Sequence, residues 1–135
     1  MKKTEEMVLL YQFVDEKKLQ ALEAVLRRLQ IKCRLLPENA YQQKVGYLFG
    51  MRGFRESKDQ EDDDFVFPHE VMVMQNIKNK PLDELLIAMR DAQIEPIRFK
   101  AVVTPFNMFW TLRRLCETMQ KEHAMMLQKD IAHEK

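Results

Sequence analysis

Hydrophobic residues recur along the first part of the chain in a strand–helix–strand pattern. Residues 7–13 are rich in strand-favouring types and apolar at consecutive positions, which is typical of a buried strand. A stripe of Leu and Val at helical spacing follows Asp15, whose carboxylate can cap the start of a helix. Apolar and charged residues then alternate over 31–35, which predicts a strand that ends at Pro37. Residues 1–37 are therefore predicted to form a βαβ unit.

Residues 70–104 repeat this pattern. A strand is predicted over 70–76, a helix opens at Asn79-Lys80-Pro81, and a further strand follows over 97–103. The two halves agree at several positions, with a slip of one residue between strand and helix: Glu6 with Glu70, Leu19 with Leu82, Leu22 with Leu85, Arg27 with Arg90, and Gln30-Ile31 with Gln93-Ile94. Two such βαβ repeats in one small domain predict an α+β fold of the ferredoxin-like, split βαβ type. The alternative is that any two βαβ units look alike.

A long C-terminal helix is predicted over residues 105–130. Thr104 offers an N-cap oxygen, and Pro105 suits the first helical position. Apolar residues then recur at spacings of three and four: Phe106, Phe109, Trp110, Leu112, Leu115, Cys116 and Met119. The predicted first and third strands are apolar on both faces, so both faces of the sheet need a cover. We expect the two earlier helices on one face and this helix on the other.

The segment between the two units, residues 38–69, is predicted to be an insertion. Tyr41, Val45, Leu48 and Phe49 share one helical face, which indicates a short helix that ends near the following glycines. Residues 56–64 then carry six acidic residues against one lysine. Such a run repels itself and is predicted to form a mobile loop.

Length and composition predict one compact domain spanning residues 1–135. The chain is 46% hydrophobic and carries a formal net charge of +1, so a nucleic-acid or membrane partner would need a local patch. The apolar run at residues 7–10 is too short for a signal peptide or a transmembrane helix. A cytoplasmic protein with no membrane partner is expected. Cys33 and Cys116 are interpreted as small buried residues rather than as a disulfide.

The sequence shows no catalytic apparatus, no metal site and no cofactor motif. His69, His123 and His133 lack the paired spacing of metal ligands, although Cys116 and His123 would share a helix face. The acidic run lacks the spacing of a calcium loop, which favours a solvated loop. No phosphate loop and no nucleophile elbow are present. No catalytic residue is therefore predicted. Enzyme activity is left open, and the sequence favours a protein that is not an enzyme.

Four residues are candidates for contacts with an anion or another small ligand. Thr104 and Asn107 lie at a predicted helix N-terminus, which is a place where anions bind, and Arg98 and Lys100 precede it on a strand. Capping explains Thr104 equally well, and charged residues protect edge strands from pairing. An RNA-binding sheet needs aromatic residues on its third strand, and residues 70–76 have none. No nucleic-acid partner is expected.

The last turns of the predicted helix are expected to overhang the sheet. A helix from Pro105 to about Gln128 spans roughly 35 Å, whereas a seven-residue strand spans only about 23 Å. The overhang is apolar enough to need a partner, and the candidate interface residues are Met119, Met125, Met126 and Leu127. The partner would be a second copy of the chain or an unknown protein. A frayed terminus is the alternative.

The second half of the chain resembles a known family. The residues that carry the resemblance are Glu70-Val71-Met72-Val73-Met74, Leu82-Asp83-Glu84-Leu85-Leu86, Gln93-Ile94-Glu95-Pro96-Ile97 and Lys100-Ala101-Val102-Val103-Thr104-Pro105-Phe106-Asn107-Met108-Phe109-Trp110. From Glu70 to about Leu127 the chain is similar to the bacterial family called domain of unknown function 3783. The resemblance implies a small cytoplasmic bacterial domain and supplies no activity.

The leading hypothesis is a non-catalytic binding, regulatory or protein-interaction module that forms a homodimer through its C-terminal helix. One alternative is a small-molecule sensor that holds a metabolite or anion near the strand-to-helix turns at residues 13–15 and 76–80. A second is an enzyme with its site at residues 104–107. Nucleic-acid binding ranks last.

Overall fold

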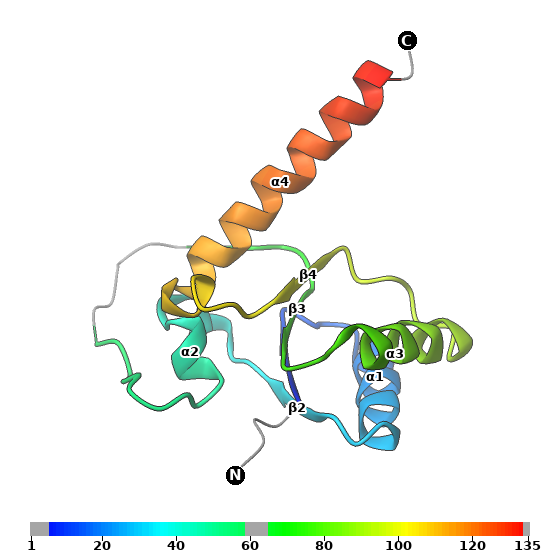
Figure 1. Cartoon of the computed structure of the whole chain (residues 1–135), viewed down its shortest axis with the longest axis horizontal. Coiled ribbons are helices and arrows are strands. Elements are labelled where there is room, and N and C mark those ends of the chain that lie inside the picture. The colour runs from blue at the N-terminus through cyan, green and yellow to red at the C-terminus, as the bar shows by residue number, and fades with distance from the viewer. Residues whose placement is uncertain (1–5, 59–64, 134–135) are drawn as a thin grey trace.

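The chain folds around one four-stranded sheet. The computed structural model describes residues 6–58 and 65–133, with side chains as far as residue 126. The strands are β1 (Met7–Tyr11), β2 (Lys32–Leu35), β3 (Val71–Gln75) and β4 (Phe99–Val102). The helices are α1 (Glu16–Arg28), α2 (Val45–Leu48), α3 (Asn79–Asp91) and α4 (Leu112–His133), with 3₁₀ turns η1 (Glu38–Gln42) and η2 (Asn107–Phe109). The predicted α+β class is confirmed (Figure 1). Most of the predicted acidic loop, residues 59–64, lies outside the described residues.

The strands follow the order β2-β1-β3-β4, which differs from a ferredoxin-like sheet. β1 pairs in parallel with β2, β3 pairs in parallel with β4, and β1 and β3 meet antiparallel at the centre. In a split βαβ arrangement, a strand of the other unit would separate the two strands of each unit. The ferredoxin-like detail is therefore not confirmed. Both arrangements place β1 and β3 centrally, so the apolar pattern that predicts the central strands does not distinguish between them.

The two βαβ units share an unusual backbone conformation at matched positions. Gln12 after β1 and Asn76 after β3 both adopt a positive φ, of 64° and 60°. Gln30 after α1 and Gln93 after α3 both have a φ of 60°. Positive φ is uncommon for residues other than glycine, so its recurrence at matched positions in both units is informative. The central pair of β1 and β3 joins two further equivalent residues, Leu9 and Val73.

One face of the sheet packs against α1 and α3 (Figure 1). The Asp15 carboxylate accepts hydrogen bonds from the backbone N–H groups of Lys17 and Lys18 and caps α1 as predicted. Both units contribute matched residues to this core: Val8, Leu10, Phe13, Leu22, Val25, Leu26 and Ile31 from the first, and Met72, Met74, Ile77, Leu85, Ala88, Met89 and Ile94 from the second, with Ile97. The expectation that these two helices share one face is confirmed.

The other face is covered by the inserted segment together with the first turns of α4. Its core consists of Leu9, Tyr11, Leu36, Ala40, Val45, Leu48, Phe49, Phe67, Val71, Val73, Phe99, Leu112, Leu115, Cys116 and Met119. The Tyr11 hydroxyl donates a hydrogen bond of 2.7 Å to the Glu38 carbonyl and fastens η1 to the sheet. The predicted long helix therefore covers only part of this face, and the remainder of α4 extends away from the sheet (Figure 1).

The long helix begins at Leu112, and the prediction that it starts at Pro105 is wrong. Trp110 is extended, with φ −80° and ψ 150°, and Thr111 accepts a hydrogen bond from the Arg114 N–H in the manner of an N-cap. The Trp110 carbonyl accepts from the Val45 N–H, and the Leu112 N–H donates to the Gln43 carbonyl. These bonds keep the backbone extended at Trp110, where the apolar spacing predicts a helix.

The altered helix start exposes two aromatic rings. Phe106 is 79% exposed and Phe109 is 57% exposed, although the sequence pattern predicts that both are buried. None of the described helices combines the length and apolar character that a membrane span requires.

Candidate functional site

The predicted ligand contacts Thr104 and Asn107 lie in one tight turn after β4. The Asn107 side chain accepts a hydrogen bond of 2.7 Å from the Thr104 N–H and donates one of 3.0 Å to the Val102 carbonyl. The Thr104 hydroxyl accepts hydrogen bonds from the N–H groups of Phe106 and Asn107. Asn107 is buried, so its polar atoms serve the backbone of the turn. The geometry favours a folding role for both residues.

The other two predicted contacts, Arg98 and Lys100, lie at the outer edge of the sheet. Both are exposed, and the Lys100 ammonium donates a 2.6 Å hydrogen bond to the Ile97 carbonyl. Strand β4 is an edge strand of the described sheet, next to β3. Charged side chains at such an edge prevent pairing with another chain, which explains both residues.

A cavity of about 300 Å³ lies between the start of α1 and the end of α3, next to the turn at residues 13–15. It is lined by Asp15, Lys17, Lys18, Ala21, Ala92, Gln93, Ile94 and Glu95. The Asp15 carboxylate is used to cap α1, and Lys18 forms a 2.6 Å ion pair with Glu70. Two of the charged groups that line this cavity, Asp15 and Lys18, are therefore already engaged within the fold.

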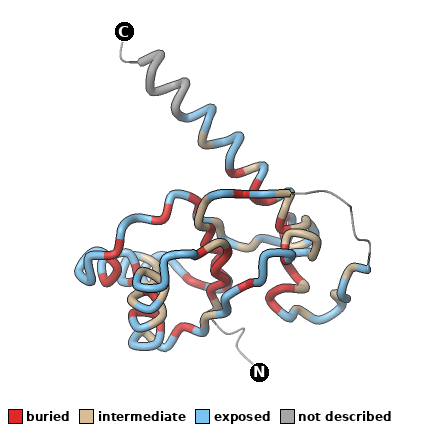
Figure 2. The backbone as a smooth tube through the Cα atoms, turned by 180° about the vertical axis from the view of Figure 1, so that it is seen from behind, coloured by how far each residue is buried: buried red, intermediate tan, exposed pale blue. Residues whose placement is uncertain are grey.

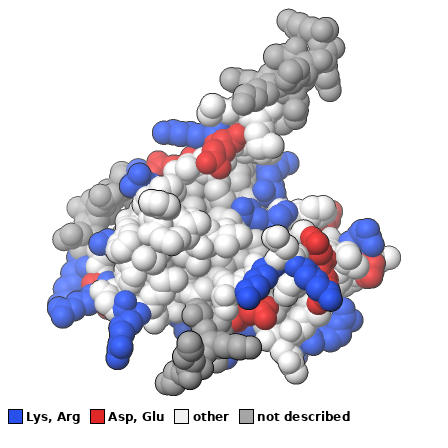
Figure 3. Space-filling view, viewed as in Figure 1, with Lys and Arg blue, Asp and Glu red and all other residues white. Residues whose placement is uncertain are grey.

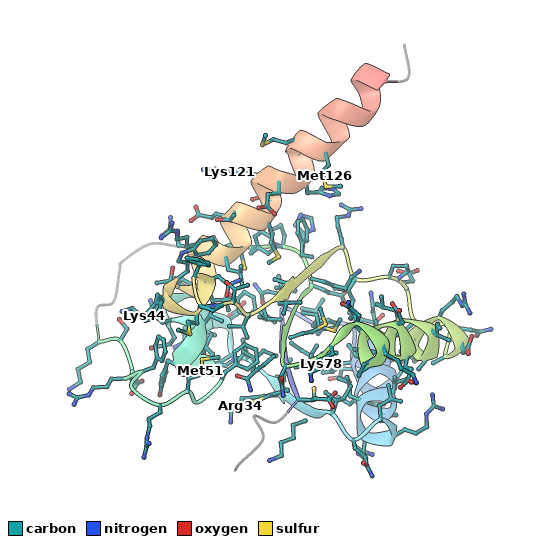
Figure 4. The ribbon with its side chains drawn as sticks, in the orientation of Figure 1. Arg34, Lys44, Met51, Lys78, Lys121 and Met126 are labelled. Atoms are coloured by element: carbon teal, nitrogen blue, oxygen red, sulfur yellow. The ribbon has the colours of Figure 1, made fainter. Side chains whose placement is uncertain are left out.

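Beyond Met119, α4 turns from a core element into an exposed one. Met119 is 9% exposed and packs in the core of the chain's own sheet, and the His123 ring lies 5.6 Å from that of Phe99. Met125 and Met126, by contrast, are 60% and 64% exposed. Figure 2 shows the change along the helix, and Figure 4 shows Met126 on the part that stands clear of the sheet. The Leu127 side chain lies outside the described residues.

The structure also has a groove that the sequence does not predict. It has a volume of about 590 Å³ and lies between the loop after α2 and the turn before α4. The residues that line this groove, called the Arg52 groove below, are Lys44, Arg52, Gly53, Phe54, Arg55, Ser57, Met108 and Phe109. Lys44 is labelled beside α2 in Figure 4. In the sequence, the one hint of this groove is that Lys44, Arg52 and Arg55 fall within a span of twelve residues.

Neither cysteine has the surroundings of a reactive thiol. Burial raises the pKa of Cys116 to about 12 and the pKa of Cys33 to about 11, with smaller contributions from Glu117 and Glu23. Cys116 is a residue of α4 and is fully buried in the core between α4 and the sheet, and Cys33 lies in β2. Among the residues that the structure describes, no three His, Cys, Asp or Glu side chains are grouped as a metal site would need.

We expect both thiols to resist alkylation while the protein is folded. At pH 8 the thiolate fraction of a group with pKa 11 is on the order of hundreds of times smaller than that of an unfolded cysteine. Iodoacetamide labelling followed by mass spectrometry should therefore show slow labelling in buffer and fast labelling in urea. Rapid labelling of Cys116 in buffer would contradict the packing of α4 on the sheet.

Comparison with protein families gives one match. Residues 70–126 match the family model described as Domain of unknown function (DUF3783). The predicted resemblance is confirmed. The DUF3783 match starts just before β3 and includes the second βαβ unit, the turn at residues 104–107 and the exposed methionines of α4. No curated protein and no solved structure matches the chain. The loop that carries Lys44, Arg52 and Arg55 lies outside the DUF3783 match.

Proposed function

We propose that this protein is a non-catalytic interaction module that forms a homodimer through the exposed part of α4. The observation that carries the proposal is the position of that helix. Its 22 residues span about 33 Å, yet His123 is the last of its described side chains that contacts the sheet. Helical turns without tertiary packing gain little stability, and exposed methionines favour association with another apolar surface.

The spacing of apolar residues along α4 supports a second helix as the partner. Leu112, Met119 and Met126 lie seven residues apart and therefore on one face. The first two pack on the sheet, and the third continues the same stripe where the sheet has ended. A second copy of α4 placed along this stripe would cover Met126 by the same type of contact.

The turn at residues 104–107 supports a binding role over an enzyme role. Both polar side chains there serve the backbone, as described above, and neither belongs to the described lining of the Arg52 groove. A different protein that binds the same stripe of α4 would compete with the second copy of the chain and so regulate dimer formation.

We expect the Met126→Glu substitution to convert a dimer into a monomer. A carboxylate in an apolar helix–helix contact loses its hydration without gaining a partner, whereas in the monomer it stays in water. Sedimentation equilibrium or size-exclusion with light scattering measures the change. Truncation after Gln120 should have the same effect, because it keeps Met119 and the core anchors and removes the overhang.

The matched control is Gln120→Glu, which adds the same charge at an exposed position of α4 away from the stripe. It should leave the dimer intact. A full-length chain that is monomeric at high micromolar concentration would refute self-association. A dimer that survives both Met126→Glu and the truncation would place the interface elsewhere.

A further inference from the structure

The Arg52 groove lies where two loops are joined by backbone pairing. Lys44 and Thr111 form an antiparallel bridge, with the hydrogen bonds from Val45 to Trp110 and from Leu112 to Gln43 on either side. The Gln43 side chain also accepts a hydrogen bond of 2.7 Å from the Ser57 N–H and donates one of 3.2 Å to the Ser57 carbonyl. These hydrogen bonds close the loop at its base, beside the groove.

Two aromatic rings form the apolar wall of the groove. The Phe54 and Phe109 ring centroids lie 5.4 Å apart, with the ring planes tilted by 38°. Gly46 makes this possible, because a β-carbon at that position would come within 2.5 Å of the Phe54 ring. Phe109 remains 57% exposed, so the wall offers an aromatic surface that no described side chain covers.

The charged residues of the groove lining that the structure describes are all positive. Lys44, Arg52 and Arg55 are exposed, and none of them forms an ion pair within the described residues. No acidic side chain is among the described residues that line the groove. Figure 3 shows Lys and Arg side chains gathered over the loop that follows α2. Three cations in the described lining favour an anionic ligand, although the net charge of the chain is only +1.

We infer that the Arg52 groove binds a mononucleotide, with the phosphate at the arginines and the base on the Phe109 ring. Guanidinium groups bind phosphate oxygens in pairs of hydrogen bonds, and a planar base stacks on an exposed aromatic ring. A volume of about 590 Å³ is in the range of small-molecule sites. A single strand of nucleic acid would need a basic track with several stacking positions, whereas these cations line one groove.

This inference does not depend on dimer formation, because the groove residues lie outside the exposed part of α4. It also differs from RNA binding by the sheet, which the sequence argues against, since both faces of the sheet are covered by packed side chains. Titration with AMP and with an oligonucleotide distinguishes a free nucleotide from one within a strand.

Isothermal titration calorimetry of the full chain with AMP tests the inference, with inorganic phosphate, adenosine and single-stranded oligothymidylate as comparison probes. We expect AMP to bind more tightly than phosphate or adenosine, and no less tightly than the oligonucleotide per nucleotide. The double variant Arg52→Gln/Arg55→Gln should weaken AMP binding by more than tenfold, because each charged hydrogen bond contributes about tenfold. Phe109→Leu, which keeps the apolar volume and removes the ring, should weaken it about tenfold.

The matched control is Arg27→Gln/Arg28→Gln, which removes two exposed arginines from α1 on the opposite face of the sheet. It should leave AMP binding within twofold of the parent chain. Thermal unfolding of every variant checks the fold, and Arg52→Gln/Arg55→Gln alters only exposed side chains. Equal affinity for AMP and phosphate would overturn the inference, as would equal losses in the groove and control variants. Much tighter binding of the oligonucleotide would assign the groove to single strands instead.

Discussion

Replacing Leu112 by alanine is expected to lower the free energy of unfolding by about 2–5 kcal/mol, the range for leucine-to-alanine changes in well-packed cores. Leu112 is fully buried among side chains of the sheet and the inserted segment. Its N–H group is bonded to the Gln43 carbonyl, so the backbone resists movement into the space left by the side chain. Urea unfolding followed by circular dichroism measures the change in midpoint, with an unchanged slope if the transition stays two-state.

The matched control for this substitution is Ile87→Ala on α3. Ile87 is also an aliphatic helix residue, but it is 48% exposed. Its truncation leaves no closed cavity, and the effect should stay within about 1 kcal/mol. Similar losses at the two positions would mean that the first turn of α4 is not packed on the sheet.

The second large effect is expected for Asn107→Ala, which should lower the free energy of unfolding by about 2–4 kcal/mol. Asn107 is 8% exposed, and its side chain satisfies the Thr104 N–H and the Val102 carbonyl. Alanine leaves both backbone groups without that partner at the end of β4. Asn107→Asp keeps the acceptor and loses the donor, so its loss should be intermediate. Urea midpoints of the three proteins provide the test.

Thr104→Ala is the control for the same turn. Its hydroxyl also bonds two backbone N–H groups, but Thr104 is exposed and water can replace part of the interaction. A loss of about 1 kcal/mol is expected, as for other caps. If Asn107→Ala left stability unchanged, its hydrogen bonds would not be needed for folding, and the enzyme interpretation of this turn would regain weight.

The central part of the fold could be predicted because its signals are local and occur twice. Leu9 and Val73 lie in segments that are apolar on both sides, and such segments form central strands. Asp15 caps a helix whose apolar stripe can only face the sheet. The match of residues 70–126 to DUF3783 likewise rests on a continuous stretch of sequence.

The candidate sites were predicted less well because they depend on contacts between distant segments. The spacing of Phe106 and Phe109 is helical, yet pairing of Trp110 and Leu112 with the inserted loop keeps them out of the helix. That pairing exposes the two rings and brings Phe109 to Phe54. No local pattern in the sequence reports a bond between residues more than sixty positions apart.

By itself the sequence determined the two βαβ units, their matched cores and the overhang of the last helix. The spacing of apolar residues and the length of each segment are local properties of the sequence. Only the tertiary structure decided the order of the strands, the true start of α4 at Leu112 and the Arg52 groove. These features depend on which distant backbone groups pair with each other. Several pairings satisfy the same apolar pattern, and the packing of the whole chain selects one of them.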